Sequence, residues 1–171
     1  NKNAKEKERA ATNALREMAR FPFRSLFVDS SSTALALAAR MELNYKTVVT
    51  NNLQTAMQLS KKPDVNLILL GGSVQFNTNS ATGSWTARQL KDFSFDLMIA
   101  SCAALIGDEA FERSLAAMER SARRLLVADS SKFSPQAHGT YRLAALSDFD
   151  CVATDSPPPE ALLGKGIRFS F

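Results

Sequence analysis

Short apolar runs alternate with longer amphipathic segments along this chain, and this alternation constrains its fold most strongly. Residues 65–70, closed by Gly71 and Gly72, are the clearest apolar run and predict a strand buried on both faces of a sheet. Alternating strands and helices predict an α/β fold, a parallel-rich sheet with helices on both faces. Residues 73–82 read as a polar loop. The expected strands are 25–28, 46–49, 65–70, 96–100, 125–128, 150–153 and 167–169, and the expected helices are 34–41, 53–60, 85–91, 109–124 and a short one after 157–159.

The excess positive charge of the chain lies at its N-terminus. Residues 1–24 hold seven basic and three acidic groups of the chain's 21 and 17, so 14 of each remain in residues 25–171. Ala10, Ala14 and Leu15 share one face of this segment, which predicts an amphipathic helix ending near Pro22. We therefore expect residues 1–24 to be a connecting helix and 25–171 to be one α/β domain without a broad nucleic-acid surface.

Several other classes of protein do not fit the sequence. No apolar run reaches the roughly 18 residues that a membrane-spanning helix needs, and no secretory leader is visible. Cys102 and Cys151 lie far apart without a paired spacing, which disfavours a disulfide scaffold or a cysteine-rich zinc site. We expect a cytoplasmic protein of 171 residues with no metal and no cofactor.

Polar residues follow five of the expected strands at the point where each strand ends. In a parallel sheet, ligands bind beyond the carboxyl ends of the strands, so these residues would share one rim. Hydroxyls, amides and helix N-termini suit a small, hydroxyl-rich anion such as a sugar phosphate, with a lysine for the phosphate. The serines also suit helix N-caps, and the glycines suit a turn. The candidate ligand-binding residues are Asp29, Ser30, Ser31, Ser32, Thr33, Thr50, Asn51, Gly71, Gly72, Asp129 and Lys132.

A series of motifs occurs in the order 27–33, 48–53, 69–72, Gly83, 95–96, 128–133 and 154–155. Through them, residues 5–170 resemble the C-terminal effector-sensing domain of DeoR-type bacterial transcriptional repressors. The resemblance implies a fold similar to ribose-5-phosphate isomerase, glucosamine-6-phosphate deaminase and CoA transferases, and a phosphorylated sugar as effector. It also implies that a winged helix-turn-helix domain, absent from this chain, binds the operator DNA. A two-fold operator calls for a symmetric homo-oligomer.

Departures from the family pattern leave alternatives open. Ser101 and Cys102 stand at the expected acidic rim, and Leu115 stands near the position of the usual lysine. One alternative is an isomerase or deaminase of the same fold, with carboxylates at the strand ends as general bases. The other is an oligomerisation domain whose ligand site has degenerated. The sole histidine, His138, lies in a polar loop, so we expect a sensor that performs no catalysis.

Overall fold

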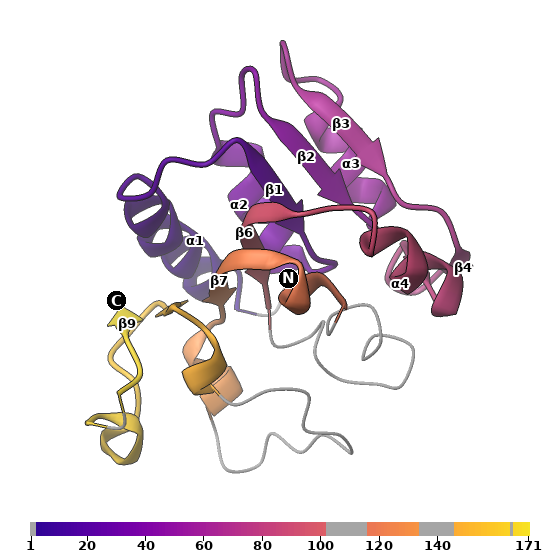
Figure 1. Cartoon of the computed structure of the whole chain (residues 1–171). Helices are drawn as coiled ribbons and strands as arrows, with labels where there is room; N and C mark the ends of the chain where they lie inside the picture. The colour runs from indigo at the N-terminus through magenta and orange to yellow at the C-terminus, as the bar shows by residue number, and fades with distance from the viewer. Residues whose placement is uncertain (1–2, 102–115, 134–145, 165) are drawn as a thin grey trace.

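A seven-stranded parallel sheet forms the centre of the protein in a computed structural model, which describes residues 3–101, 116–133, 146–164 and 166–171 (Figure 1). The spatial order of the strands is β3-β2-β1-β6-β7-β8-β9. The chain therefore builds outward from β1 to β3, returns to the other side of β1 with β6, and continues outward again. The strands are β1 (Ser25–Val28), β2 (Thr47–Thr50), β3 (Asn66–Leu69), β6 (Phe95–Ala100), β7 (Ser121–Val127), β8 (Cys151–Ala153) and β9 (Phe169–Ser170).

Helices cover both faces of the sheet, which confirms the predicted α/β class. Successive residues of β1 alternate between two cores: Leu26 and Val28 pack beneath α1, α2 and α3, and Phe27 packs on the opposite face with α4. No helix in the described part of the chain is long and apolar enough to cross a membrane. The helices are α1 (Ala4–Met18), α2 (Ser32–Arg40), α3 (Leu53–Leu59) and α4 (Ser84–Leu90), with short 3-10 helices η2 (Ser130–Phe133), η3 (Leu146–Asp148) and η4 (Glu160–Leu162).

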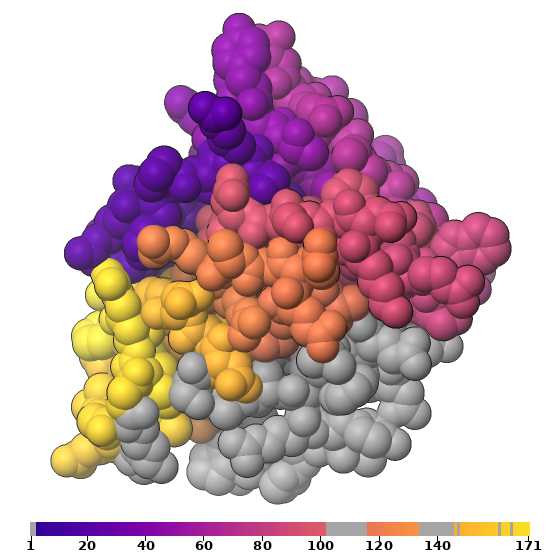
Figure 2. Space-filling model, viewed as in Figure 1, coloured from indigo at the N-terminus to yellow at the C-terminus, as the bar shows by residue number. Residues whose placement is uncertain are grey.

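The N-terminal helix is an integral part of the core. Ala10, Ala11 and Ala14 of α1 are fully buried against the sheet. Glu17 near the end of α1 accepts from Arg168 at 2.9 Å, just before β9. In Figure 2 the first and last parts of the chain accordingly lie side by side. The 24/25 boundary predicted from the sequence thus divides two segments that share one core.

The run at 65–70 was expected to be buried on both faces, and this expectation is wrong. β3 is an edge strand, and Leu69 keeps 48% of its surface exposed. An apolar run has the same composition in a central strand as in an edge strand, so composition alone does not distinguish them.

Residues 73–82 form a hairpin rather than a loop. β4 (Ser73–Gln75) and β5 (Ser80–Thr82) pair antiparallel in a separate two-stranded sheet. The turn between them carries asparagine and threonine, residues that favour turns, so the polar sequence masked two short strands.

The helix expected at 109–124 ends earlier than predicted. Residues 116–119 are helical, but β7 begins at Ser121, and residues 109–115 lie outside the described part of the chain. Arg123 and Arg124 pair with Leu97 and Met98 of β6. Arginine and alanine favour helices, and here strand pairing outweighs that local preference.

Candidate functional site

The strand order reverses between β1 and β6, and open parallel sheets bind ligands at such a reversal, beyond the carboxyl ends of the strands. A cleft of about 310 Å³ lies at this edge, next to the loop that follows β1. Its walls come from the start of α2, the start of α3 and the turn of the β4–β5 hairpin. The lining residues are Ser30, Ser31, Ser32, Leu35, Asn52, Gln54, Asn77, Thr78 and Asn79.

Two helix N-caps hold the walls of this cleft together. Ser31 Oγ accepts from the Ala34 N–H at 2.8 Å and caps α2. Of the serines that the sequence analysis considered as helix N-caps, Ser31 therefore has that role. Asn52 Oδ1 accepts from the Thr55 N–H at 2.9 Å and caps α3. The same Asn52 amide donates to Ser30 Oγ at 3.0 Å and to the Thr78 carbonyl at 2.9 Å. One side chain therefore links all three walls.

Thr50 and Asn51 support the cleft from below and do not line it. The Thr50 hydroxyl donates to the Val28 carbonyl at 2.8 Å and accepts from the Asn52 N–H at 3.2 Å. The Asn51 amide donates to the Ala81 carbonyl at 2.9 Å and thereby fixes the hairpin against β2. Both side chains are fully buried. Their contribution to ligand binding would be indirect, through the position of the hairpin wall.

Gly71 and Gly72 approach α4 closely. The Gly71 carbonyl accepts from Thr86 Oγ1 and from Gln89 Nε2, each at 2.8 Å, and the Gly71 N–H donates to Gln89 Oε1 at 3.1 Å. A Cβ on Gly72 would lie 2.0 Å from Thr86 Oγ1, so only glycine fits there. The sequence analysis expected the backbone of these glycines to approach a ligand. In the structure, the backbone of Gly71 hydrogen-bonds to side chains of α4.

The second part of the rim follows β7 and β8. Asp129 is buried, and its Oδ1 accepts from the Ser131 hydroxyl and, at 3.2 Å, from the Ser131 N–H. Asp155 accepts from the Ser130 N–H at 2.6 Å and from its hydroxyl at 3.1 Å. Lys132 is exposed and does not line the cleft. The lining of this cleft thus includes Ser30, Ser31 and Ser32 but not Lys132, the lysine that the sequence analysis selected for the phosphate.

The first turn of α1 connects the two parts of the rim, and the sequence analysis missed it. Lys7 Nζ donates to Ser32 Oγ at 3.1 Å, and Asn3 Nδ2 donates to Ser131 Oγ at 3.1 Å. Figure 1 shows the N-terminus beside β7, near the carboxyl ends of the strands. The available signal was the excess of positive charge at the start of the chain, which the sequence analysis assigned to a connecting helix.

The carboxylate after β1 is buried and hydrogen-bonded. Asp29 is fully buried, and its Oδ1 accepts from the Ser30 N–H at 2.7 Å. Thr33 is also buried, in the first turn of α2. Ser101, which follows β6, is buried, and its hydroxyl has no hydrogen-bond partner among the described residues. Cys102, Leu115 and His138 lie outside the described residues.

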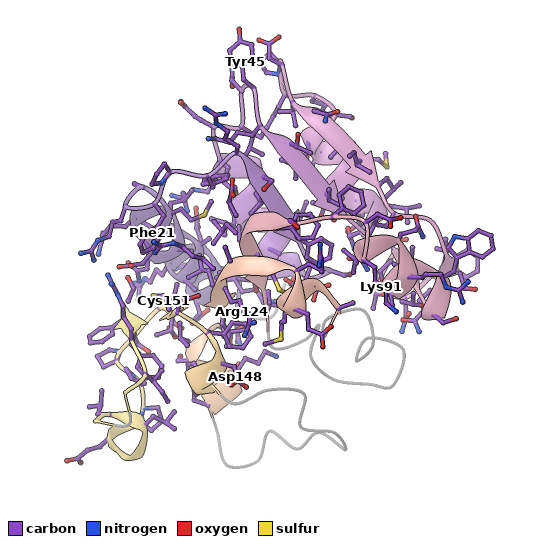
Figure 3. The ribbon with its side chains drawn as sticks, viewed as in Figure 1. Phe21, Tyr45, Lys91, Arg124, Asp148 and Cys151 are labelled. Carbon is purple, nitrogen blue, oxygen red and sulfur yellow. The ribbon has the colours of Figure 1, made fainter. Side chains whose placement is uncertain are left out.

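The ionisable groups with shifted pKa values lie away from the cleft. Burial, with Glu17 nearby, raises the pKa of the Cys151 thiol to about 11, so this cysteine is a protonated core residue. In Figure 3, Cys151 lies near Phe21, beside the C-terminal end of α1. In the described ranges no three His, Cys, Asp or Glu residues gather as metal ligands would.

Comparisons with known proteins give a consistent result. Residues 2–156 match the family model described as the DeoR C terminal sensor domain. A glycerol-3-phosphate regulon repressor of Escherichia coli (strain K12) is 30% identical over 149 residues, which cover 81% of this chain and 58% of that protein. A repressor of the same name from Haemophilus influenzae is 32% identical over 143 residues, covering 78% and 55%. The HTH-type transcriptional regulator GolR of Listeria innocua is 28% identical over 148 residues, covering 82% and 58%. The chain spans slightly more than half the length of these relatives, all of which are named as transcriptional regulators.

Proposed function

Because this chain belongs to the DeoR C-terminal sensor domain family, we propose that it is the effector-binding part of a transcriptional repressor. Its effector is a small phosphorylated sugar or sugar alcohol, bound in the cleft between α2, α3 and the hairpin. The observation that carries this proposal is the hydroxyl and amide lining of that cleft, beyond the carboxyl ends of β1 and β2. The relatives named for a glycerol-3-phosphate regulon support the same class of ligand.

The size and lining of the cleft suit a short polyol. Its volume of about 310 Å³ is near the lower end of the roughly 300–1,000 Å³ typical of small-molecule sites. Amide and hydroxyl side chains both donate and accept hydrogen bonds, as a polyol requires. An apolar ligand would instead strip water from these groups and leave them without hydrogen bonds, which is unfavourable.

The start of α2 is the place for the phosphate. The first turn of a helix presents backbone N–H groups without intrahelical acceptors, and the helix dipole favours an anion there. Lys7 Nζ, bonded to Ser32 Oγ at 3.1 Å, brings a positive charge to the same point. We assign Lys7 to the phosphate in place of Lys132, because Ser32 lines the cleft and Lys132 does not.

The carboxylates of the rim support binding without catalysis. Enolisation of a sugar phosphate needs a general base directed at the substrate. Asp29, Asp129 and Asp155 instead accept hydrogen bonds from N–H or hydroxyl groups of the loops that carry them. These bonds organise the loops, which supports sensing over isomerisation or deamination.

Through the contacts of its N-terminal end, α1 transmits effector binding to the rest of the repressor. Lys7 lies in its first turn and Asn3 is its N-cap residue, so an effector bound at Ser32 changes what holds the N-terminal end of α1 in place. We assign operator binding to a helix-turn-helix segment outside this chain, reached through the N-terminal end of α1. We place the whole repressor in the cytoplasm, where its operator DNA lies.

The test is calorimetric binding of matched ligand pairs to the chain. Glycerol 3-phosphate and a set of sugar phosphates are each compared with the same compound lacking its phosphate. At least one phosphorylated compound is expected to bind, and its unphosphorylated counterpart to bind far more weakly. Gln54→Trp should block the cleft and abolish binding, whereas Gln58→Trp, one turn further along α3, should not.

Three results would contradict the proposal. The first is binding that does not depend on the phosphate. The second is binding that Gln54→Trp leaves unchanged, since this would place the ligand outside the cleft. The third is incorporation of deuterium from the solvent into a bound sugar phosphate, measured by NMR, since this would show catalysis in place of sensing.

A further inference from the structure

The side-chain amide of Asn52 has an orientation that its backbone partners fix. Its Oδ1 accepts from the Thr55 N–H at 2.9 Å, and its Nδ2 donates to the Thr78 carbonyl at 2.9 Å. An N–H can only donate and a carbonyl can only accept, so the two ends of this amide cannot be exchanged. The third contact, between Nδ2 and Ser30 Oγ at 3.0 Å, therefore has Asn52 as its donor and Ser30 as its acceptor.

Asn52 has no proton left to offer a ligand. Both protons of its Nδ2 are used, one by Ser30 and one by the hairpin, and its backbone N–H donates to Thr50 Oγ1. The residue is also only 5% exposed. The influence of Asn52 on a ligand therefore passes through the groups that it holds. Among these, Ser30 is half-buried and lines the cleft.

The three serines of the cleft share one feature, because each hydroxyl oxygen accepts from a group that can only donate. The donors are the Asn52 amide for Ser30, the Ala34 N–H for Ser31 and the Lys7 ammonium for Ser32. A serine hydroxyl has one proton to donate and two lone pairs that accept. Each of these contacts uses a lone pair and leaves the hydroxyl proton for another acceptor. The serine wall of the cleft is therefore rich in donors.

A wall of donors suits one end of a phosphorylated polyol. The phosphate of a monoester carries a charge of about −1.5 to −2 at neutral pH, and its oxygens are strong acceptors. The hydroxyls of a polyol need both donors and acceptors, which the amides of Gln54, Asn77 and Asn79 supply on the other walls. The polarity of the walls therefore orients such a ligand, with its phosphate at the serines and its hydroxyls at α3 and the hairpin.

We propose that Asn52 is a positioning residue of the effector cleft, which directs the hydroxyl proton of Ser30 to the phosphate. This inference rests on the proposed function, because it needs a phosphorylated effector in the cleft. A hydroxyl whose oxygen is already held loses less conformational freedom when the effector binds, so the contact with Asn52 strengthens the contact with the phosphate. The sequence analysis selected Thr50 and Asn51 from the same motif and did not select Asn52.

The substitution Asn52→Asp reverses the polarity of this contact at nearly constant shape. Aspartate caps helices as well as asparagine does, so its carboxylate still accepts from the Thr55 N–H. It has no proton for Ser30, so the Ser30 hydroxyl donates to the carboxylate and is withdrawn from the phosphate. The probe is whichever of glycerol 3-phosphate and the tested sugar phosphates binds the wild type most tightly. Calorimetry is expected to show an affinity at least about ten-fold lower for the variant.

Two further variants separate this effect from added charge and from lost support of the walls. Gln54→Glu places the same charge in the lining of the cleft and is expected to cost less than Asn52→Asp. Ser30→Ala is expected to weaken binding about ten-fold in the wild type but less than about two-fold beside Asn52→Asp, where the proton is already withdrawn. If Asn52 only supported the walls, Ser30→Ala would cost the same in both backgrounds. Circular dichroism checks that all variants are folded.

The outcomes distinguish this inference from the proposed function. Equal costs of Ser30→Ala in the two backgrounds overturn the inference alone, and so does a loss with Gln54→Glu as large as that with Asn52→Asp. A wild-type chain that binds none of the phosphorylated compounds overturns the proposed function, and the inference with it. If Asn52→Asp does not fold, Asn52→Ser takes its place. Serine also caps helices but lacks the amide that reaches Ser30, so the cost of Ser30→Ala should again fall.

Discussion

Replacing Lys7 with glutamine is expected to weaken binding of the phosphorylated effector by about ten-fold. Lys7 Nζ lies 3.1 Å from Ser32 Oγ at the cleft, and no ion pair in the described residues holds its charge. A hydrogen bond to a charged group contributes about 1.5–3 kcal/mol. Because Lys7 is partly exposed, the lower end of this range applies. A change of 1.4 kcal/mol in binding free energy corresponds to a factor of about ten in Kd.

Calorimetry with the tightest ligand, at low and at physiological salt, measures this effect. The variant should also lose part of the salt dependence, since a charge has been removed from the site. Lys5→Gln removes the same charge from the same helix and is the control, expected to bind as the wild type does. Lys132→Gln tests the placement predicted from the sequence. Unchanged affinity for Lys7→Gln together with a ten-fold loss for Lys132→Gln would refute our assignment and move the phosphate toward η2.

The remaining predictions concern the stability and packing of the fold. Gly72→Ala should lower the free energy of unfolding by about 2 kcal/mol or more in urea titrations, because Gly72 has a φ of 154° and its new Cβ would meet Thr86 Oγ1; an unchanged midpoint would contradict the close packing. The backbone N–H of Arg24, with that of its neighbour, holds the pKa of Asp96 below its usual 3.8. This stabilisation is complete above the usual pKa and is lost as the pH falls through the lowered one, so Asp96→Asn should flatten the acid side of the stability curve. Cys151, with a pKa of about 11, should resist alkylation at neutral pH until the chain unfolds; rapid labelling of the native chain at this residue would refute its burial.

The position of the candidate cleft was predictable from the sequence because a parallel sheet brings all its strand ends to one edge. Ser30, Ser31 and Ser32 follow the first apolar run and open a helix, and the structure places all three at the cleft. Their neighbours in the motif series, Thr50 and Asn51, lie next to the cleft but beneath it. Residue order assigns a side chain to an edge of the sheet, whereas its direction depends on the hydrogen bonds it finds there.

The other walls of the cleft were not predictable in this way. Asn77, Thr78 and Asn79 are separated from α3 in sequence, and their polar stretch resembles any surface loop. They become a wall because Asn52 bonds the Thr78 carbonyl and the Asn51 amide holds the hairpin, which are tertiary contacts. The burial expected for β3 failed for a related reason. Whether a strand lies at the centre or at the edge of a sheet depends on the neighbours that it finds in the fold, and the apolar run 65–70 has the same composition in either place.

The helix α1 relates the core of the domain to the proposed signal. Its middle and end are fixed, because Ala10 and Ala14 are buried in the core and Glu17 is paired with Arg168. Its N-terminal end is held by polar contacts, from Lys7 to Ser32 and from Asn3 to Ser131 and Asp129. Polar contacts near the surface contribute little stability each, so a ligand that competes for Lys7 can rearrange the first turn without disturbing the core. Under the proposed function, the output of the sensor is therefore best sought at the N-terminal end of α1, where the candidate cleft and the proposed path to a DNA-binding segment meet.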